Sequence, residues 1–248
     1  MFFLLILMNL LFSQEQKSEQ WMKHSVEFKA NCYQVYSNAS KMLDSAIKDR
    51  MWSAIPSQME DQMVWDKKLA IILDLDETVI DNIGYYDFLR SKDTSHTSEN
   101  WDIWVSKAEA TAIVGAVEFI KKAEAKGIEI FYITNRACKQ LDSVKCPQQE
   151  STLENLKKIG LKSDDYHLLL KDEYKSWTSD KGIRRQMLTE QYRILMLVGD
   201  DFNDFYDNAV NLEQANKEDA LYKNIKYFGE RWFIIPNPNY GTWQNFNK

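Results

Sequence analysis

Glycine and proline are scarce in this sequence, at 8 and 4 of 248 residues, well below their usual combined share. This scarcity disfavours a loop-rich all-β fold and a chain of domains joined by flexible linkers. The three cysteines are too few for a disulfide scaffold, and a mean hydropathy of −0.49 excludes a polytopic membrane protein. With 44% hydrophobic residues the chain can bury a core and is not disordered. We therefore expect one α/β domain with an appendage.

Positive charge is also in short supply. The 31 Lys and Arg residues are outnumbered by 37 Asp and Glu residues, which leaves a formal net charge of −6. Such a surface repels nucleic-acid polymers and anionic membranes, so we expect neither as a partner. A small anionic substrate is not excluded, because a bound cation can reverse the field at one site.

Long apolar runs are confined to the N-terminus, where residues 1–13 read MFFLLILMNLLFS. The run is too short to cross a bilayer comfortably and is typical of the apolar region of an export signal. No Lys or Arg precedes it and no A-x-A cleavage motif follows it, so a buried tail remains the alternative. We expect residues 1–19 to be a signal or tail and residues 20–248 to form a single domain.

The cysteines allow one local disulfide. Cys138 and Cys146 lie in one polar loop that ends in Pro147, and this spacing could close a bridge in an oxidising compartment. Bridged and free thiols remain equally open. Cys32 lies in a helical pattern and is expected to be a small core residue.

Strand and helix patterns alternate along the chain. Apolar residues recur at a spacing near 3.6 from Trp21 to Met51, which predicts one or two helices. Short apolar runs predict strands at 68–73, 128–133, 167–170, 194–198 and 231–235. Helices are predicted at 115–127, 151–160 and 179–191, whereas 82–112 reads as irregular and aromatic. The alternation favours a parallel sheet covered by helices on both faces.

Polar residues directly follow four of these strands, which is where α/β sheets bind ligands. Asp74 and Asp76, two positions apart, lie on the same side of an extended segment. Two such carboxylates repel each other unless a proton or cation lies between them, and oxygen ligands suit Mg²⁺. An acidic turn capping a helix would explain a lone D-x-D. It does not explain the further strand-end groups: Thr134-Asn135-Arg136, Lys171 and the segment GDDFND at 199–204.

The motifs IILDLDETVIDN and ILMLVGDDFNDF resemble those of the haloacid dehalogenase (HAD) superfamily. More narrowly, they resemble class C bacterial acid phosphatases, which include lipoprotein 5′-nucleotidases. The similarity runs from about Trp21 through WDIWV, GAVEFI and YITNR to IIPNPNYGTW, and so covers most of the chain. The resemblance implies a HAD-like Rossmannoid sheet flanked by helices, with a small helical and aromatic cap. The N-terminal region and an insertion at 82–112 would form this cap.

The resemblance also implies an exported, Mg²⁺-dependent phosphomonoesterase, often dimeric, that prefers nucleoside 5′-monophosphates. Asp74 would attack phosphorus, and Asp76 would protonate the leaving oxygen and then activate water. The implied metal-binding groups are Asp74, the Asp76 backbone carbonyl, Asp200 and, through metal-bound waters, Asp204. The implied phosphate-binding groups are Thr134 and Asn135, with Lys171 offsetting charge on the nucleophile and phosphate.

Aromatic residues are abundant, with 8 Trp, 12 Tyr and 12 Phe. By the same resemblance, Trp101 and Tyr240 fall in segments whose rings sandwich a flat leaving group. Tyr85, Trp104 and Trp243 are better explained by core packing.

The sequence departs from the lipoprotein pattern in one respect, because no cysteine closely follows the apolar leader. Membrane anchoring is therefore doubtful, and a periplasmic or secreted enzyme is expected, with a cytoplasmic HAD phosphatase as the alternative. A binding or storage protein on the same fold is a further alternative. Such plant relatives commonly lose the nucleophile, whereas this chain keeps the full set of Asp74, Asp76, Lys171 and Asp200.

Overall fold

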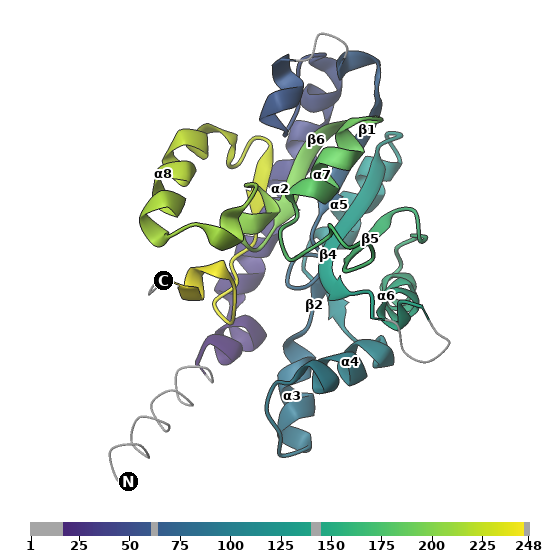
Figure 1. Cartoon of the computed structure of the whole chain (residues 1–248), viewed down its shortest axis with the longest axis vertical. Helices are drawn as coiled ribbons and strands as arrows, with labels where there is room; N and C mark the ends of the chain where they lie inside the picture. The colour runs from purple at the N-terminus through teal and green to yellow at the C-terminus, as the bar shows by residue number, and fades with distance from the viewer. Residues whose placement is uncertain (1–16, 61–63, 140–144, 246–248) are drawn as a thin grey trace.

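The computed structural model describes residues 17–60, 64–139 and 145–245, and the apolar leader lies outside these ranges. Five parallel strands form the central sheet in the order β5-β4-β1-β6-β7 (Figure 1). Their bounds are β1 Lys68–Leu73, β4 Glu129–Ala137, β5 Leu168–Lys171, β6 Tyr192–Gly199 and β7 Trp232–Ile234. The predicted parallel α/β fold is confirmed. Among the described helices, none is both long enough and apolar enough to cross a membrane.

Helices cover both faces of this sheet. On one face lie α2 (Val26–Lys48) and α5 (Ala116–Glu124), and on the other lies α7 (Gly182–Thr189) (Figure 1). Successive side chains of a strand point to opposite faces. Ile71 and Leu73 accordingly join the cluster under α2 and α5, whereas Ala70 and Ile72 join the cluster under α7. Burying each aliphatic side chain of Ile or Leu size contributes about 1.5–3 kcal/mol, so the strongly apolar strands hold the layers together.

The insertion after β1 is helical rather than irregular. A two-stranded antiparallel ribbon of β2 (Ile80–Asp81) and β3 (Thr111–Ala112) brackets α3 (Ile83–Ser91) and α4 (Ser98–Lys107). These two helices extend beyond the sheet (Figure 1). The side chain of Thr97 accepts a hydrogen bond from the backbone of Asn100 and so caps α4, a signal that the aromatic content obscured.

The N-terminal region contacts this insertion, as expected for a shared cap. Residues 17–24 are helical. Lys23 pairs with Asp87 at 2.6 Å, and Arg90 pairs with Glu19. The two segments therefore meet along the C-terminal half of α3.

Two boundaries and one helix differ most from expectation. β4 continues to Ala137 instead of ending at Ile133. The following helix, α6 (Pro147–Lys158), begins at Pro147, which suits the first helical turn because its missing N–H needs no partner there. The helix predicted at 151–160 thus begins four residues earlier than expected. Helix α8 (Gln214–Asn224) was not expected, because few of its residues are apolar. Short 3-10 turns occupy Pro56–Glu60, Val64–Asp66, Phe202–Asp204, Ala209–Asn211, Ile225–Tyr227 and Thr242–Asn245.

Of the two alternatives for Cys138 and Cys146, the structure shows the disulfide. Cys138 and Cys146 form a disulfide that joins the end of β4 to the start of α6. Cys32 is fully buried in the cluster under α2, as expected of a core residue.

Candidate active site

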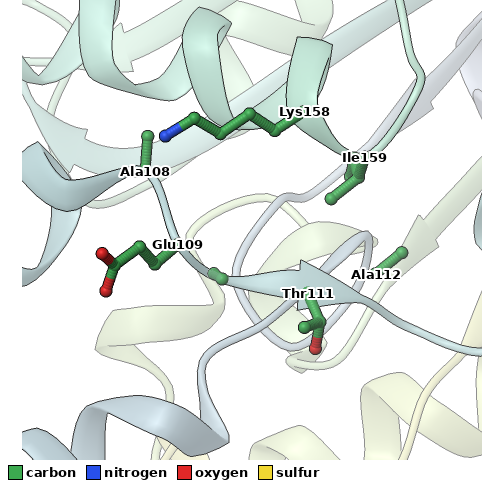
Figure 2. A pocket seen from close by; sticks show the side chains of 7 residues that line it. Ala108, Glu109, Thr111, Ala112, Lys158 and Ile159 are labelled. Carbon is green, nitrogen blue, oxygen red and sulfur yellow. The ribbon is translucent and has the colours of Figure 1, made fainter.

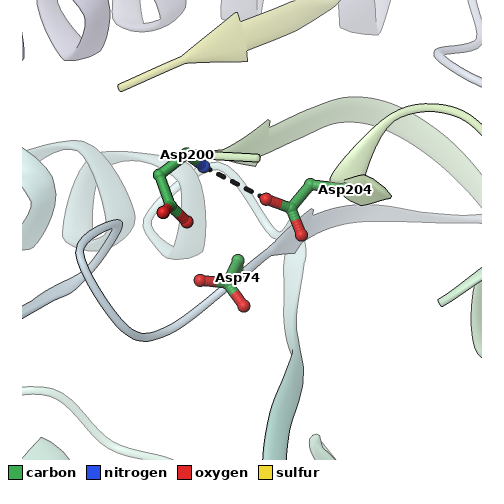
Figure 3. Close-up of side chains that lie close together, drawn as sticks. All are labelled: Asp74, Asp200 and Asp204. Carbon is green, nitrogen blue, oxygen red and sulfur yellow. Dashed lines mark hydrogen bonds between the residues drawn. The ribbon is translucent and has the colours of Figure 1, made fainter. Parts of the chain in front are cut away.

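Three carboxylates meet at the carboxyl edge of the sheet (Figure 3). Asp74 directly follows β1, and Asp200 and Asp204 follow the adjacent strand β6. Oxygen atoms of these three side chains lie within 4.8 Å of one another. The turn packs so tightly that a Cβ on Gly199 would lie 2.2 Å from Oδ2 of Asp204, which explains the glycine there. The sheet topology therefore builds an acidic cluster from residues more than 120 positions apart.

Backbone and side-chain donors fix the two carboxylates that follow β6. Oδ2 of Asp204 accepts hydrogen bonds from the backbone N–H of Asp200 at 3.1 Å and of Asp201 at 2.9 Å. Asp200 accepts from the hydroxyl of Thr78 at 3.2 Å and from the amide of Asn237 at 2.7 Å. Burial raises the pKa of Asp200 well above its ordinary value, and repulsion from nearby Asp74 and Asp204 adds to this rise. A cation would relieve both effects.

The ammonium group of Lys181 reaches this cluster. It lies just before α7, is only 5% exposed, and donates hydrogen bonds to Asp74 and, at 2.6 Å, to Asp204. Burial alone would lower the pKa of Lys181, but attraction to Asp204 and Asp74 outweighs burial and raises it. Burial raises the pKa of Asp74 to about 7 against the opposing pull of Lys181, with repulsion from Asp204 and Asp76 adding to it.

Lys171 does not occupy the place expected of it. Its ammonium group lies 3.8 Å from the carboxylate of Asp172 at the outer edge of the sheet. It ends β5, which is separated from β1 by β4. Two strand spacings amount to about 9.6 Å, so a residue at the end of β5 is far from Asp74. The position beside Asp74 that was expected for Lys171 is instead occupied by Lys181, which immediately precedes α7.

Asp76 faces a different cation. The guanidinium of Arg136 donates to both carboxylate oxygens of Asp76, at 2.7–3.1 Å, and also to the hydroxyl of Thr152 at 2.9 Å. The amide of Asn82 donates to Asp76 at 2.8 Å. Arg136 is 2% exposed, so this pairing is shielded from water. The guanidinium of this strand-end arginine therefore orients the Asp76 carboxylate.

Thr134 and Asn135 lie at the same edge, near the end of β4. Thr134 is fully buried, whereas Asn135 is exposed. The side-chain oxygen of Asn135 accepts from Arg184 at 2.9 Å, and its amide donates to the carbonyl of Ser179 at 3.1 Å. Arg184, buried on α7, also donates to the Thr134 carbonyl at 2.6 Å, so it ties α7 to this strand end.

The two rings expected to flank the substrate contact different residues near Asp76: Trp101 contacts Arg136, and Tyr240 contacts Glu77. Trp101 on α4 lies 5.8 Å from the guanidinium carbon of Arg136, measured to the ring centroid. Tyr240 is 39% exposed, and its hydroxyl donates to the carboxylate of Glu77. Of the three rings assigned to packing, Tyr85 and Trp104 are buried as expected, but Trp243 is 46% exposed.

The donor set fits a divalent cation. Asp74, Asp76, Asp200 and Asp204 carry two more formal charges than their partners Lys181 and Arg136 neutralise. All the clustered side-chain donors are oxygens, which is the preference of Mg²⁺ rather than of softer metals. The Asp76 carboxylate is not part of the three-residue cluster, and Arg136 holds it.

Several residues that shape the site were not expected, namely Lys181, Arg184, Asn237 and Glu77. Lys181 lies in the segment SDKG at a predicted helix start, and helix starts that follow parallel strands return to the ligand-binding edge. The sequence alone therefore contained a signal that could have identified Lys181. Asn237 and Glu77 carried no comparable signal, because their roles depend on contacts with Asp200 and Tyr240.

The described residues form one hollow that reaches the acidic cluster and another that does not. One, of about 960 Å³, runs between α2 and β7 and reaches Asp200 and Asn237. The other, of about 440 Å³, lies between the segment after α4 and the end of α6, where the Lys158 side chain extends toward Ala108 (Figure 2). None of the residues assigned to the acidic cluster lines this second hollow.

Comparisons with known proteins agree with the fold described above. The chain is similar to the class C acid phosphatase of Bacillus anthracis, with 31% identity, a TM-score of 0.76, and coverage of 94% of this chain and 87% of that one. A structure of that enzyme with tungstate bound aligns at 29% identity, a TM-score of 0.75 and the same coverage of both chains.

Plant proteins are also similar. Acid phosphatase 1 of Solanum lycopersicum is 25% identical over 156 residues, 61% of this chain and 57% of that protein. A stem 31 kDa glycoprotein of Glycine max is 26% identical over 174 residues, 68% of this chain and 58% of that protein. The match thus spans less than two thirds of the length of either plant relative. Residues 10–243 match the family described as HAD superfamily, subfamily IIIB (acid phosphatase), so the chain belongs to that family.

Proposed function

We propose that this protein is a phosphomonoesterase that forms an aspartyl-phosphate on Asp74 and favours substrates with flat leaving groups such as nucleoside 5′-monophosphates. The observation that carries the proposal is the convergence of Asp74, Asp200, Asp204 and Lys181 at one edge of the sheet, where all but the half-buried Asp200 are buried. Membership of an acid phosphatase family supports the same reaction class.

In the proposed reaction, an Asp74 oxygen attacks phosphorus while Asp76 gives a proton to the departing oxygen of the substrate. The P–O bond to the leaving group breaks as the bond to Asp74 forms. Asp76, now ionised and paired with Arg136, then takes a proton from the water that attacks the aspartyl-phosphate. This releases inorganic phosphate and returns both carboxyl groups to their starting states.

Charge at the phosphoryl group is handled by several groups. Lys181 stabilises the nucleophile and the equatorial oxygens, and Thr134 and Asn135 provide further donors at the end of β4. Mg²⁺, held by Asp74, Asp200, the Asp76 carbonyl and waters oriented by Asp204, would supply additional electrostatic stabilisation of the phosphoryl oxygens. The hydrogen bond from Asn237 orients the Asp200 carboxylate toward this proposed metal position.

Selectivity for the leaving group is assigned to the rings of Trp101 and Tyr240. Stacking on an aromatic ring contributes about 1–3 kcal/mol per base and tolerates every base, so several nucleotides should be accepted. We infer a periplasmic or secreted enzyme, because the Cys138–Cys146 disulfide is typical of an oxidising compartment.

The test is phosphate release from nucleotides, sugar phosphates and aryl phosphates, with and without Mg²⁺. The proposal requires metal-dependent turnover and a lower KM for substrates with flat leaving groups. Tight binding of these compounds without turnover would instead favour the storage or binding alternative.

A further inference from the structure

Asp102 lies on α4 next to Trp101 and is held by two residues that flank the disulfide. The ammonium group of Lys139 donates to both of its carboxylate oxygens, at 3.2 and 2.9 Å. The side-chain amide of Gln148 donates to the same carboxylate. Lys139 directly follows Cys138, and Gln148 comes two residues after Cys146.

These two partners are themselves attached to the end of the sheet. The side-chain oxygen of Gln148 accepts from the backbone N–H of Ala137 at 3.0 Å. The N–H of Cys138 donates to the carbonyl of Lys171 at 2.7 Å. Arg136, whose guanidinium lies against Trp101, is the residue just before Ala137. The Asp102 contacts therefore set the position of α4 relative to the strand end that carries Arg136.

We propose that Asp102 is a positioning residue: together with the Cys138–Cys146 disulfide, it places the Trp101 ring over the site and so determines selectivity for flat leaving groups. The inference rests on the proposed function and adds a specificity determinant that does not itself touch the substrate. Its effect should appear only with leaving groups large enough to reach Trp101.

Other contacts keep α4 attached when Asp102 is replaced. The indole of Trp104 donates to the side chain of Asn82 at 2.9 Å, and the amide of Asn155 donates to the carbonyl of Ala110 at 2.7 Å. Loss of the Asp102 contacts should therefore loosen the end of the helix near Trp101 without unfolding it. Because the Asp102 and Lys139 side chains are partly exposed, at 28% and 39%, we expect an effect of about 3- to 10-fold.

The test compares Asp102→Ala with Glu99→Ala, a matched loss of a carboxylate from an exposed position of the same helix. The substrates are a nucleoside 5′-monophosphate and glycerol phosphate. In the Asp102 variant, KM for the nucleotide should rise about 3- to 10-fold with kcat unchanged, and KM for glycerol phosphate should not change. Equal rises for both substrates, or an equal effect of Glu99→Ala, would overturn the inference.

Reduction provides a second arm. Dithiothreitol gives two electrons and two protons to the disulfide, which yields two protein thiols and the cyclic disulfide of the reagent. In the wild-type protein, reduction should raise KM for the nucleotide. The Asp102 variant should show no further rise, because the disulfide acts through that carboxylate. A rise of the same size in both proteins would contradict the link between them.

Hydrogen exchange separates this inference from the proposed function. Backbone amides of α4 near Trp101 should exchange faster in the Asp102 variant and in the reduced wild-type protein, but not in the Glu99 variant. Unchanged exchange in the Asp102 variant would overturn the positioning role. An absence of turnover in the wild-type protein would contradict the proposed function instead, whatever the exchange result.

Discussion

The ammonium group of Lys181 contacts the carboxylate of Asp74 although 107 positions separate the two residues in the sequence. The same ammonium group binds Asp204 at 2.6 Å. One buried lysine thereby bridges the carboxyl ends of β1 and β6, which are neighbours in the sheet. The contact partly balances the negative charge of Asp74, Asp200 and Asp204, and it fixes the position of the Asp74 carboxylate.

Replacing this lysine should abolish most of the activity. Lys181→Met leaves two buried carboxylates unpaired, so we expect kcat to fall by about 100-fold or more and stability to fall by about 3–5 kcal/mol. Phosphate release and thermal unfolding measure the two effects. Lys171→Met, at the outer edge of the sheet, is the matched control and should retain most of the activity. A larger loss in the Lys171 variant would restore the role expected from the sequence.

The nucleophile and the metal can be tested together. Asp74→Asn should eliminate phosphate release while leaving the circular dichroism spectrum unchanged, because the amide keeps the size of the carboxyl group. Chelation by EDTA should remove wild-type activity, and added Mg²⁺ should restore it. Asp172→Asn, at an exposed position, should behave as wild type. Near-full turnover by the Asp74 variant would refute the aspartyl-phosphate mechanism.

Arg136 should matter most for substrates whose leaving group needs a proton. Arg136→Lys keeps the charge but loses the two-pronged contact with Asp76. We expect kcat for an alkyl phosphate to fall about 10- to 100-fold. The fall should be much smaller for p-nitrophenyl phosphate, whose leaving group departs unprotonated. An equal fall for both substrates would show that Arg136 does not act through the Asp76 proton.

Cys32 should be chemically inert in the folded protein. Burial raises the pKa of its thiol to about 12, and nearby Asp81 adds to the rise, so almost no thiolate exists at pH 8. A thiol-reactive disulfide reagent at pH 8 should not label the native protein at Cys32, but should label it after unfolding in guanidinium. Peptide mass spectrometry identifies the labelled cysteine. Fast labelling of Cys32 in the native state would mean that α2 detaches readily from the sheet.

Local patterns predicted the sheet well because its strands are short apolar runs between helical segments. Residues 68–73 were assigned without error to β1, and Asp74, Asp200 and Asp204 meet where the ends of parallel strands must meet. The insertion at 82–112 was harder, because its helices α3 and α4 are rich in aromatic residues that obscure the helical period. Neither Thr97 as a cap nor the ribbon between β2 and β3 was recognised.

The sequence by itself determined the fold class and the acidic cluster, since apolar periodicity and strand-end chemistry are local properties of the chain. Only the tertiary structure decided which lysine reaches Asp74, because that depends on strand order. β5 is an edge strand two positions from β1, while the turn before α7 returns to the centre of the sheet. Likewise, only packing paired Arg136 with Asp76 and Tyr240 with Glu77. Several side chains far apart in sequence could pair with the same buried group, and their positions in the folded structure decide which pair forms.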